Sequence, residues 1–142
     1  ERKVLQSEVS SVVGGQANEV EADLHARLAA MADLNFEAGL LLALGKLPFY
    51  KRLLTLFIDG HGNDVCLLAE LIERNELAAA ERLAHFLKGA AGSVVATPIY
   101  LMASDLDVAL KSGDRAAAQA ALAPLAERLP RLIAAVRDAL AA

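Results

Sequence analysis

The stretch that decides the fold is Asn75–Asp114, NELAAAERLAHFLKGAAGSVVATPIYLMASDLDVALKSGD. Its first half is rich in Ala and Leu, which are strong helix formers, and its apolar residues recur every three or four positions. This pattern predicts a helix over 76–95. Thr97 followed by Pro98 is a cap and first-turn signal for a second helix that reaches about Ser112. Because only a few residues join the two helices, we predict an antiparallel hairpin.

Three more helices are predicted before this hairpin. Asn18 is a suitable N-cap for an amphipathic helix over 19–32, in which apolar residues recur at spacings of three and four. A short helix follows within 33–45, DLNFEAGLLLALG, and ends at its last glycine. The apolar face over 48–74 predicts one long helix, with a bend or break near Gly60 as the main alternative.

The C-terminal part predicts one more helix, over 115–140, with kinks at Pro124 and Pro130. No strand-like stretch of any length occurs in the sequence. The expected fold class is therefore all-α, an antiparallel up-and-down four-helix bundle with an additional N-terminal helix or helices. We expect a linker and N-terminal amphipathic helix over 1–33 and the bundle domain over 34–142.

Composition and charge exclude several classes of function. The net charge of −4 and the pI near 5.3 argue against a nucleic-acid-binding surface. No apolar run approaches the roughly 20 residues of a membrane-spanning helix. The single cysteine, Cys66, cannot form an intramolecular disulfide, which favours a reducing compartment, so we expect the cytoplasm. The first residue is Glu and no signal peptide follows, which indicates a piece of a longer or processed protein.

The helix predicted over 76–95 has two distinct sides. Its core seam has a three-four spacing and consists of Leu77, Ala80, Ala84, Leu87, Ala91 and Val94. His85, Lys88, Gly89 and Gly92 fall together on another side of the helical wheel. His85 lies roughly 130° from the centre of the seam, so we expect it at the surface.

A phosphoryl group could be carried on this side of the helix. Neutral imidazole is a nucleophile near physiological pH, and Lys88, one turn from His85, could hold phosphoryl oxygens by charge. Gly89 and Gly92 would leave the surface open, although each costs about 1 kcal/mol of helix stability relative to alanine. The alternative is that His85 is an ordinary solvated side chain and that the glycines serve close helix packing.

The segment AHFLKGAAGSV resembles the signature of histidine-containing phosphotransfer (HPt) domains, whose core is HxxKG on a bundle helix. The resemblance extends to PFYKRLLTLFID, to LMASDLDVALKSGD and to the terminal Ala- and Leu-rich helix, and it covers roughly 34–140. Two positions depart from the family pattern. Val94-Val95 stands where the family commonly has Leu-Gly, and Asp107 stands where it tends to have Glu or Gln.

The resemblance implies a phosphorelay carrier of two-component signalling and not an enzyme with turnover. By this resemblance, His85 is the phosphoacceptor, Lys88 supplies positive charge for the phosphate, and Gly89 leaves steric access to the histidine. Gly92 has a secondary role. The expected partners are receiver domains of response regulators and of a hybrid sensor histidine kinase, without nucleic acid or membrane contact by this domain. No cofactor of its own is expected, and Mg²⁺ would belong to the receiver.

The register of the hairpin is expected to place two residues of its second helix near this site. With the hairpin centred near 96–97, residue 85 faces about 108, so Asp107 could lie beside the imidazole. We hypothesise that Asp107 accepts the Nδ1 proton and leaves Nε2 as the nucleophile. Lys111, one turn further on, is a weaker candidate for a phosphate or receiver contact.

Two other functions are compatible with a helical bundle. One is a scaffold or dimerisation module that binds receivers without being phosphorylated. The other is the dimerisation domain of a histidine kinase, which would need an acidic residue directly after the histidine, where this chain has Phe86. The intact set of His85, Lys88 and Gly89 favours the phosphocarrier. For 1–33 we prefer a linker to an upstream receiver over a helix that packs on the bundle or on a second copy.

The remaining candidate residues are interpreted structurally. His61 and Cys66 lack a second pair of ligands, so no metal site is expected, and Cys66 is interpreted as buried. His25 is interpreted as solvated. Phe86 and Leu83 are assigned to the core. Four acidic residues are interpreted as a solvent-exposed helix face: Glu70, Glu73, Glu76 and Glu81.

Overall fold

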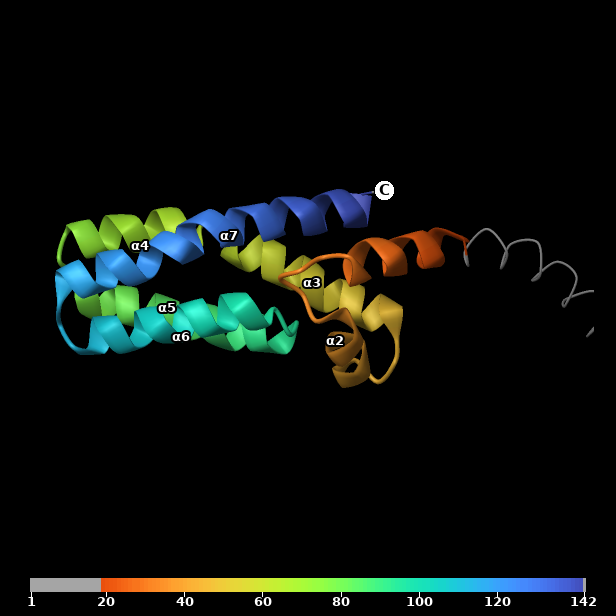
Figure 1. Cartoon of the computed structure of the whole chain (residues 1–142), viewed down its shortest axis with the longest axis horizontal. Helices are drawn as coiled ribbons and strands as arrows, with labels where there is room; N and C mark the ends of the chain where they lie inside the picture. Colours follow the sequence, from red (N-terminus) through yellow and green to blue (C-terminus); the bar gives the residue numbers. More distant parts are fainter. Residues whose placement is uncertain (1–18, 142) are drawn as a thin grey trace, which may run out of the picture.

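The structure is a computed structural model that describes residues 19–141, all of them in helices or in the short connections between helices (Figure 1). After a helical stretch over 19–29, the elements are α2 (Phe36–Leu42), α3 (Leu47–His61), α4 (Asp64–Glu73), α5 (Leu77–Ser93), α6 (Thr97–Lys111) and α7 (Arg115–Ala141). No strand occurs between residues 19 and 141, so the predicted all-α class is confirmed. The predicted linker over 1–17 and the N-cap Asn18 lie outside the described residues.

Four helices form the predicted antiparallel bundle. α5 packs against α4 and α6, and α7 packs against the same two helices from the other side, which closes a ring of four. The connections span only 74–76, 94–96 and 112–114, and such short connections make successive helices antiparallel neighbours. α3 lies beyond the end of α4 and contacts both α5 and α7 (Figure 1).

The prediction of one continuous helix over 48–74 is wrong, and the alternative of a break is correct. Gly60, the position at which the break was expected, lies inside α3. The interruption falls on Gly62 and Asn63, two successive residues with poor helix propensity. A buried hydrogen bond between the residues that flank them, described below, holds the two helices at this break.

The C-terminal helix is continuous. α7 runs from Arg115 to Ala141 through both Pro124 and Pro130, so neither proline ends it. Asp114 caps its first turn, because its Oδ1 accepts a hydrogen bond from the backbone N–H of Ala117 at 3.1 Å.

The core is aliphatic, and the seam predicted on α5 is confirmed. Its buried members are Ala80, Ala84, Leu87, Ala91 and Val94, with Leu77 partly buried, and they face Ile99, Ala103, Leu106 and Leu110 of α6. Leu83 is half-buried against this core, as assigned.

Two core assignments are wrong. Phe86 is 65% exposed, and its ring centroid lies 4.9 Å from that of His61, the last residue of α3. Cys66 is exposed because the buried stripe of the short helix α4 runs through Asp64, Leu68 and Ile72, at a spacing of four residues that leaves Cys66 on another side.

The N-terminal helical stretch packs on the bundle core. It ends at residue 29, earlier than the predicted 32, and buries Leu24 and Leu28 within the same apolar cluster as the bundle helices. Just after it, Asp33 forms a hydrogen-bonded ion pair with Arg128 of α7. This packing agrees with the alternative of a helix that packs on the bundle. The link to an upstream receiver remains a prediction.

Candidate functional site

The side of α5 opposite its buried seam carries the predicted site residues. The His85 side chain is 67% exposed, as expected from the helical wheel. α5 is long and rich in Ala and Leu, so the imidazole stands on a rigid support anchored by the core seam. The ring is therefore accessible to another macromolecule while its backbone is fixed.

The two glycines on this side differ in their surroundings. A methyl group added at Gly89 would meet no atom within 4 Å, apart from the neighbouring backbone of α5. One added at Gly92 would lie 3.5 Å from the ring of Tyr100 on α6. Gly89, one turn after His85, thus opens onto solvent, whereas Gly92 faces a neighbouring side chain within the hairpin.

Lys88 is held loosely above α6. Its Nζ lies 5.6 Å from the centroid of the Tyr100 ring, a cation–π distance. Such a contact at a surface is worth only about 0.5–1 kcal/mol. The lysine, one turn from His85, can therefore exchange this contact for a stronger one with an anion.

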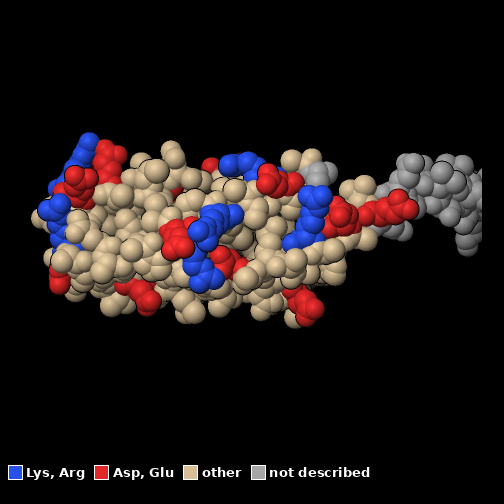
Figure 2. Space-filling model, turned by 45° about the horizontal axis from the view of Figure 1, so that its top comes forward, with Lys and Arg blue, Asp and Glu red and all other residues tan. Residues whose placement is uncertain are grey.

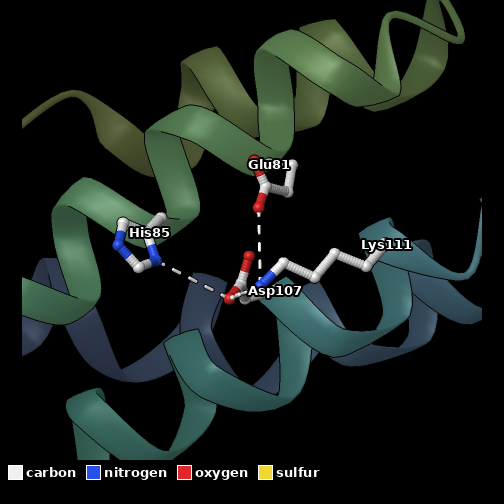
Figure 3. A network of polar contacts seen from close by, with 4 residues as sticks. All are labelled: Glu81, His85, Asp107 and Lys111. Atoms are coloured by element: carbon white, nitrogen blue, oxygen red, sulfur yellow. Dashed lines mark hydrogen bonds and ion pairs between the residues drawn. The ribbon is translucent and has the colours of Figure 1, made fainter.

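Asp107 lies beside the imidazole, as the hairpin register predicts (Figure 3). The carboxyl group is 2% exposed, and its Oδ2 lies 3.8 Å from His85 Nδ1. This distance suits an ionic interaction but exceeds the 2.7–3.2 Å range of a hydrogen bond. The predicted neighbourhood is present, and a small movement of either side chain would be needed for the proposed Nδ1–H hydrogen bond.

A second pair lies one turn further along the hairpin. Lys111 Nζ donates a hydrogen bond to Asp107 Oδ2 at 3.2 Å and lies 3.7 Å from Glu81 Oε1 (Figure 3). Glu81 was not predicted as a site residue. The register contained the signal: Glu81 precedes His85 by four residues and Lys111 follows Asp107 by four, so a hairpin that pairs His85 with Asp107 also pairs Glu81 with Lys111.

The network favours an ionised Asp107. Burial by itself would raise the pKa of the Asp107 carboxyl, but the hydrogen bond and positive charge of Lys111 outweigh it and hold this pKa below its usual range. The same hydrogen bond raises the pKa of Lys111. Within the described residues Asp107 Oδ1 has no hydrogen-bond partner, which leaves the carboxylate one free acceptor beside His85.

An apolar groove of about 590 Å³ adjoins His85. One wall is formed by Leu53, Leu56 and Phe57 of α3, and the other by His85, Phe86, Gly89 and Ala90 of α5. Figure 2 shows one face of the molecule, on which acidic and basic side chains lie in mixed clusters with wide uncharged areas between them. A groove of this kind next to an exposed histidine is suited to a transient protein contact.

Comparison with known proteins decides the family. The family model described as "Hpt domain" matches residues 52–139, more than half of the chain. This chain belongs to the HPt family. No match was found among the curated proteins or among the solved structures. The match begins inside α3, so the stretch over 19–29 and α2 lie outside it.

Membership of the HPt family indicates the general function of this chain. HPt domains take part in phosphotransfer in two-component signalling, where they act as phosphocarriers, not enzymes, and interact with receiver domains. No helix in the described part of this HPt domain is long and apolar enough to cross a membrane.

Both departures from the family pattern have a structural consequence. Val95, at the position where glycine is common, adopts a left-handed backbone with φ of 55°, a strained conformation for a β-branched residue. Its carbonyl accepts a hydrogen bond from the backbone N–H of Asn35 at 2.9 Å. Asp107 is one methylene shorter than the Glu or Gln expected at this position, and its Oδ2 lies 3.8 Å from His85 Nδ1.

The other titratable candidates have separate places in the HPt domain. His25 is exposed, as interpreted, and lies edge-on to Phe36 with the ring centroids 4.5 Å apart. His61 is buried and bonded to Asp64, a contact that the sequence analysis missed because it depends on the break between α3 and α4. Between residues 19 and 141, no three or more His, Cys, Asp or Glu side chains form a group that could hold a metal ion.

Proposed function

We propose that this HPt domain is a phosphorelay carrier in which His85 is the phosphoacceptor. It would accept the phosphoryl group from the aspartyl phosphate of one receiver domain and pass it to the aspartate of a response regulator. The observation that carries the proposal is an imidazole exposed to 67% beside the open surface at Gly89, with the ionised carboxylate of Asp107 3.8 Å from its Nδ1.

This geometry supports the following transfer step. Neutral His85 with its proton on Nδ1 attacks phosphorus through the lone pair of Nε2, forming the N–P bond while the P–O bond to the receiver aspartate breaks. The aspartate leaves as a carboxylate with the bonding electron pair. The ring then carries positive charge with the proton still on Nδ1, and the Asp107 carboxylate stabilises that charge. Closing from 3.8 Å to hydrogen-bond distance would strengthen this effect in the transition state.

The two lysines have different proposed roles. Lys88, whose contact with Tyr100 is weak, would turn to the phosphoryl oxygens. Lys111 would stay on Asp107 and offset the repulsion between that carboxylate and the incoming phosphoryl group. The domain would supply no cofactor, because Mg²⁺ on the receiver would neutralise the phosphoryl charge during transfer.

The groove beside His85 is the proposed docking surface for receivers. Its apolar walls and the exposed Phe86 lie next to the imidazole, so a partner seated there would bring its aspartate within reach of Nε2. We further propose that the domain is a cytoplasmic module of a hybrid sensor histidine kinase, whose own receiver would be one of the partners.

The test is transfer of radiolabelled phosphoryl from a phosphorylated receiver domain to the parent, to His85→Gln and to His25→Gln. His25 is also exposed, which makes it the matched control. Acid-labile, alkali-stable label on the parent and on His25→Gln, but not on His85→Gln, is the expected result. Addition of EDTA should block transfer from the receiver and leave labelling by phosphoramidate, a small phosphoryl donor, unchanged.

The same experiment distinguishes the alternative function. If several receivers bind the parent but none transfers label to it, the domain is a receiver-binding scaffold. Label that persists on His85→Gln would place the phosphoacceptor elsewhere. Unchanged uptake by Asp107→Ala would remove Asp107 from the mechanism while leaving His85 as acceptor.

A further inference from the structure

A buried hydrogen bond spans the break between α3 and α4. α3 ends at His61 and α4 begins at Asp64, and His61 Nδ1 donates to Asp64 Oδ2 at 2.5 Å. Both residues are almost fully buried, His61 at 4% and Asp64 at 2% exposure. A buried pair of this kind adds little net stability compared with apolar side chains of the same size. A role in fixing local geometry is the better account of it.

The His61 ring supports the aromatic side chain that follows the phosphoacceptor. Its centroid lies 4.9 Å from that of Phe86, with the two planes at 62°, an edge-to-face arrangement. On its other side it lies 5.7 Å from Phe57 at 33°. Phe86 is 65% exposed, so the ring of His61 is its main aromatic support from the protein side.

The pair therefore connects the helix break to the groove beside His85. Asp64 holds the His61 ring in one orientation through its hydrogen bond, and that ring packs edge-to-face with the ring of Phe86. His61, Phe57 and Phe86 all line the groove. An exposed phenylalanine has two free side-chain torsions, and a partner must immobilise them on binding unless the protein has already done so.

We propose that His61 and Asp64 are a positioning pair that fixes Phe86, and with it the groove wall that a receiver domain meets on the way to His85. The inference rests on the proposed phosphocarrier function and deepens it. Among the described residues, the pair forms no hydrogen bond or ring contact with the imidazole of His85, so we assign it to partner docking and not to the chemical step.

Two other roles for His61 fit the structure less well. At 4% exposure it is too buried to be a second phosphoacceptor for a macromolecular donor. With Asp64 as its neighbouring carboxylate, it does not belong to any metal-binding group of three or more ligands in the described part of the chain.

The experiment compares two phosphoryl donors on the parent and on His61→Gln. Glutamine keeps an N–H donor for Asp64 but lacks the aromatic ring. With a phosphorylated receiver we expect the KM of His61→Gln, taken as the half-saturating concentration in single-turnover transfer, to rise about two- to tenfold, the range set by one aromatic pair, with the limiting transfer rate unchanged. With phosphoramidate, which needs no docking surface, labelling of His85 should proceed at the parent rate.

Two further variants test the route through Phe86. Phe86→Leu should raise KM by itself, and adding His61→Gln to it should raise KM no further, because both act through one contact. The double variant His61→Phe with Asp64→Asn keeps a ring against Phe86 but lacks the hydrogen bond that orients it, so it should recover part of the increase in KM and not all of it. It also provides the test if His61→Gln does not fold.

The outcomes separate the inference from the function on which it rests. An unchanged KM in folded His61→Gln, a fully additive effect with Phe86→Leu, or no recovery in the double variant would overturn the positioning role. Slower labelling by phosphoramidate would also overturn it, since that would place His61 in the chemistry. A parent that takes label from neither donor would instead refute the proposed function.

Discussion

Gly89→Ala is expected to stabilise the protein and to slow phosphotransfer. Gly89 lies inside α5, and the added methyl group would meet no atom within 4 Å. The gain is then the helix propensity difference, about 1 kcal/mol, without a steric penalty. For a chain of this length it corresponds to a rise in Tm of roughly 3–5 °C. Thermal unfolding followed by circular dichroism measures it.

The loss of transfer has a separate cause. The methyl group would stand one turn from His85, on the surface across which a receiver brings its aspartyl phosphate. Because a misplacement of 1 Å can cost about 100-fold in rate, we expect transfer from a phosphorylated receiver to fall at least about tenfold in Gly89→Ala and further in Gly89→Leu. Labelling by phosphoramidate should change much less.

Gly92→Ala is the matched control in the same helix. Its methyl group would contact the Tyr100 ring at 3.5 Å, an ordinary van der Waals distance, and it does not line the groove. We expect a smaller gain in stability, because Gly92 is in the last turn, and transfer at the parent rate. A Gly89→Ala protein less stable than the parent would refute the reasoning about open space. Parent-like transfer by Gly89→Leu would refute the access role.

Three more predictions follow from the site and the core. Lys111 holds the pKa of Asp107 low, so the resulting stability is present above about pH 4, the ordinary aspartate range, and is lost as pH falls through the lower folded-state pKa. The urea midpoint of Asp107→Asn should therefore lie furthest below that of the parent near pH 7 and approach it near pH 3, and a constant gap would contradict this. Tyr50→Phe removes the buried 2.7 Å hydrogen bond to the Val94 carbonyl and should cost about 1–2 kcal/mol in urea unfolding; an unchanged midpoint would show that the carbonyl finds another partner. Lys88→Gln should lower stability by less than about 1 kcal/mol, since its contact with Tyr100 is weak, yet slow phosphotransfer by about tenfold or more. Parent-like transfer by this variant would assign the phosphate contact to another residue.

The helix pattern was predictable because the core is built from regularly spaced Ala and Leu. The seam on α5 and the register that brings Asp107 to His85 both follow from a period of 3.6 residues and a short connection. Glu81 could have been found by the same register. Glu81 was interpreted as a solvated acidic residue because Lys111, which faces it across the hairpin, was not considered.

The features that were not predictable depend on tertiary contacts. The break at Gly62 and Asn63 is accompanied by the hydrogen bond between His61 and Asp64, and a hydrophobic pattern does not encode that contact. Phe86 is exposed at the place where α3 ends, with its ring against His61, the last residue of that helix. An aromatic residue next to a core seam is normally assigned to the core, and this assignment fails where an opposing helix ends.

The ion pair between Asp33 and Arg128 has a consequence for the order of folding. It joins residues 95 positions apart, whereas the α5–α6 hairpin closes through the connection 94–96. Contacts between residues distant in sequence carry a larger loop-closure entropy and form late. The hairpin that carries His85 is thus expected to nucleate folding. The helical stretch over 19–29, although synthesised before the bundle helices, should dock last, once α7 is available to receive it.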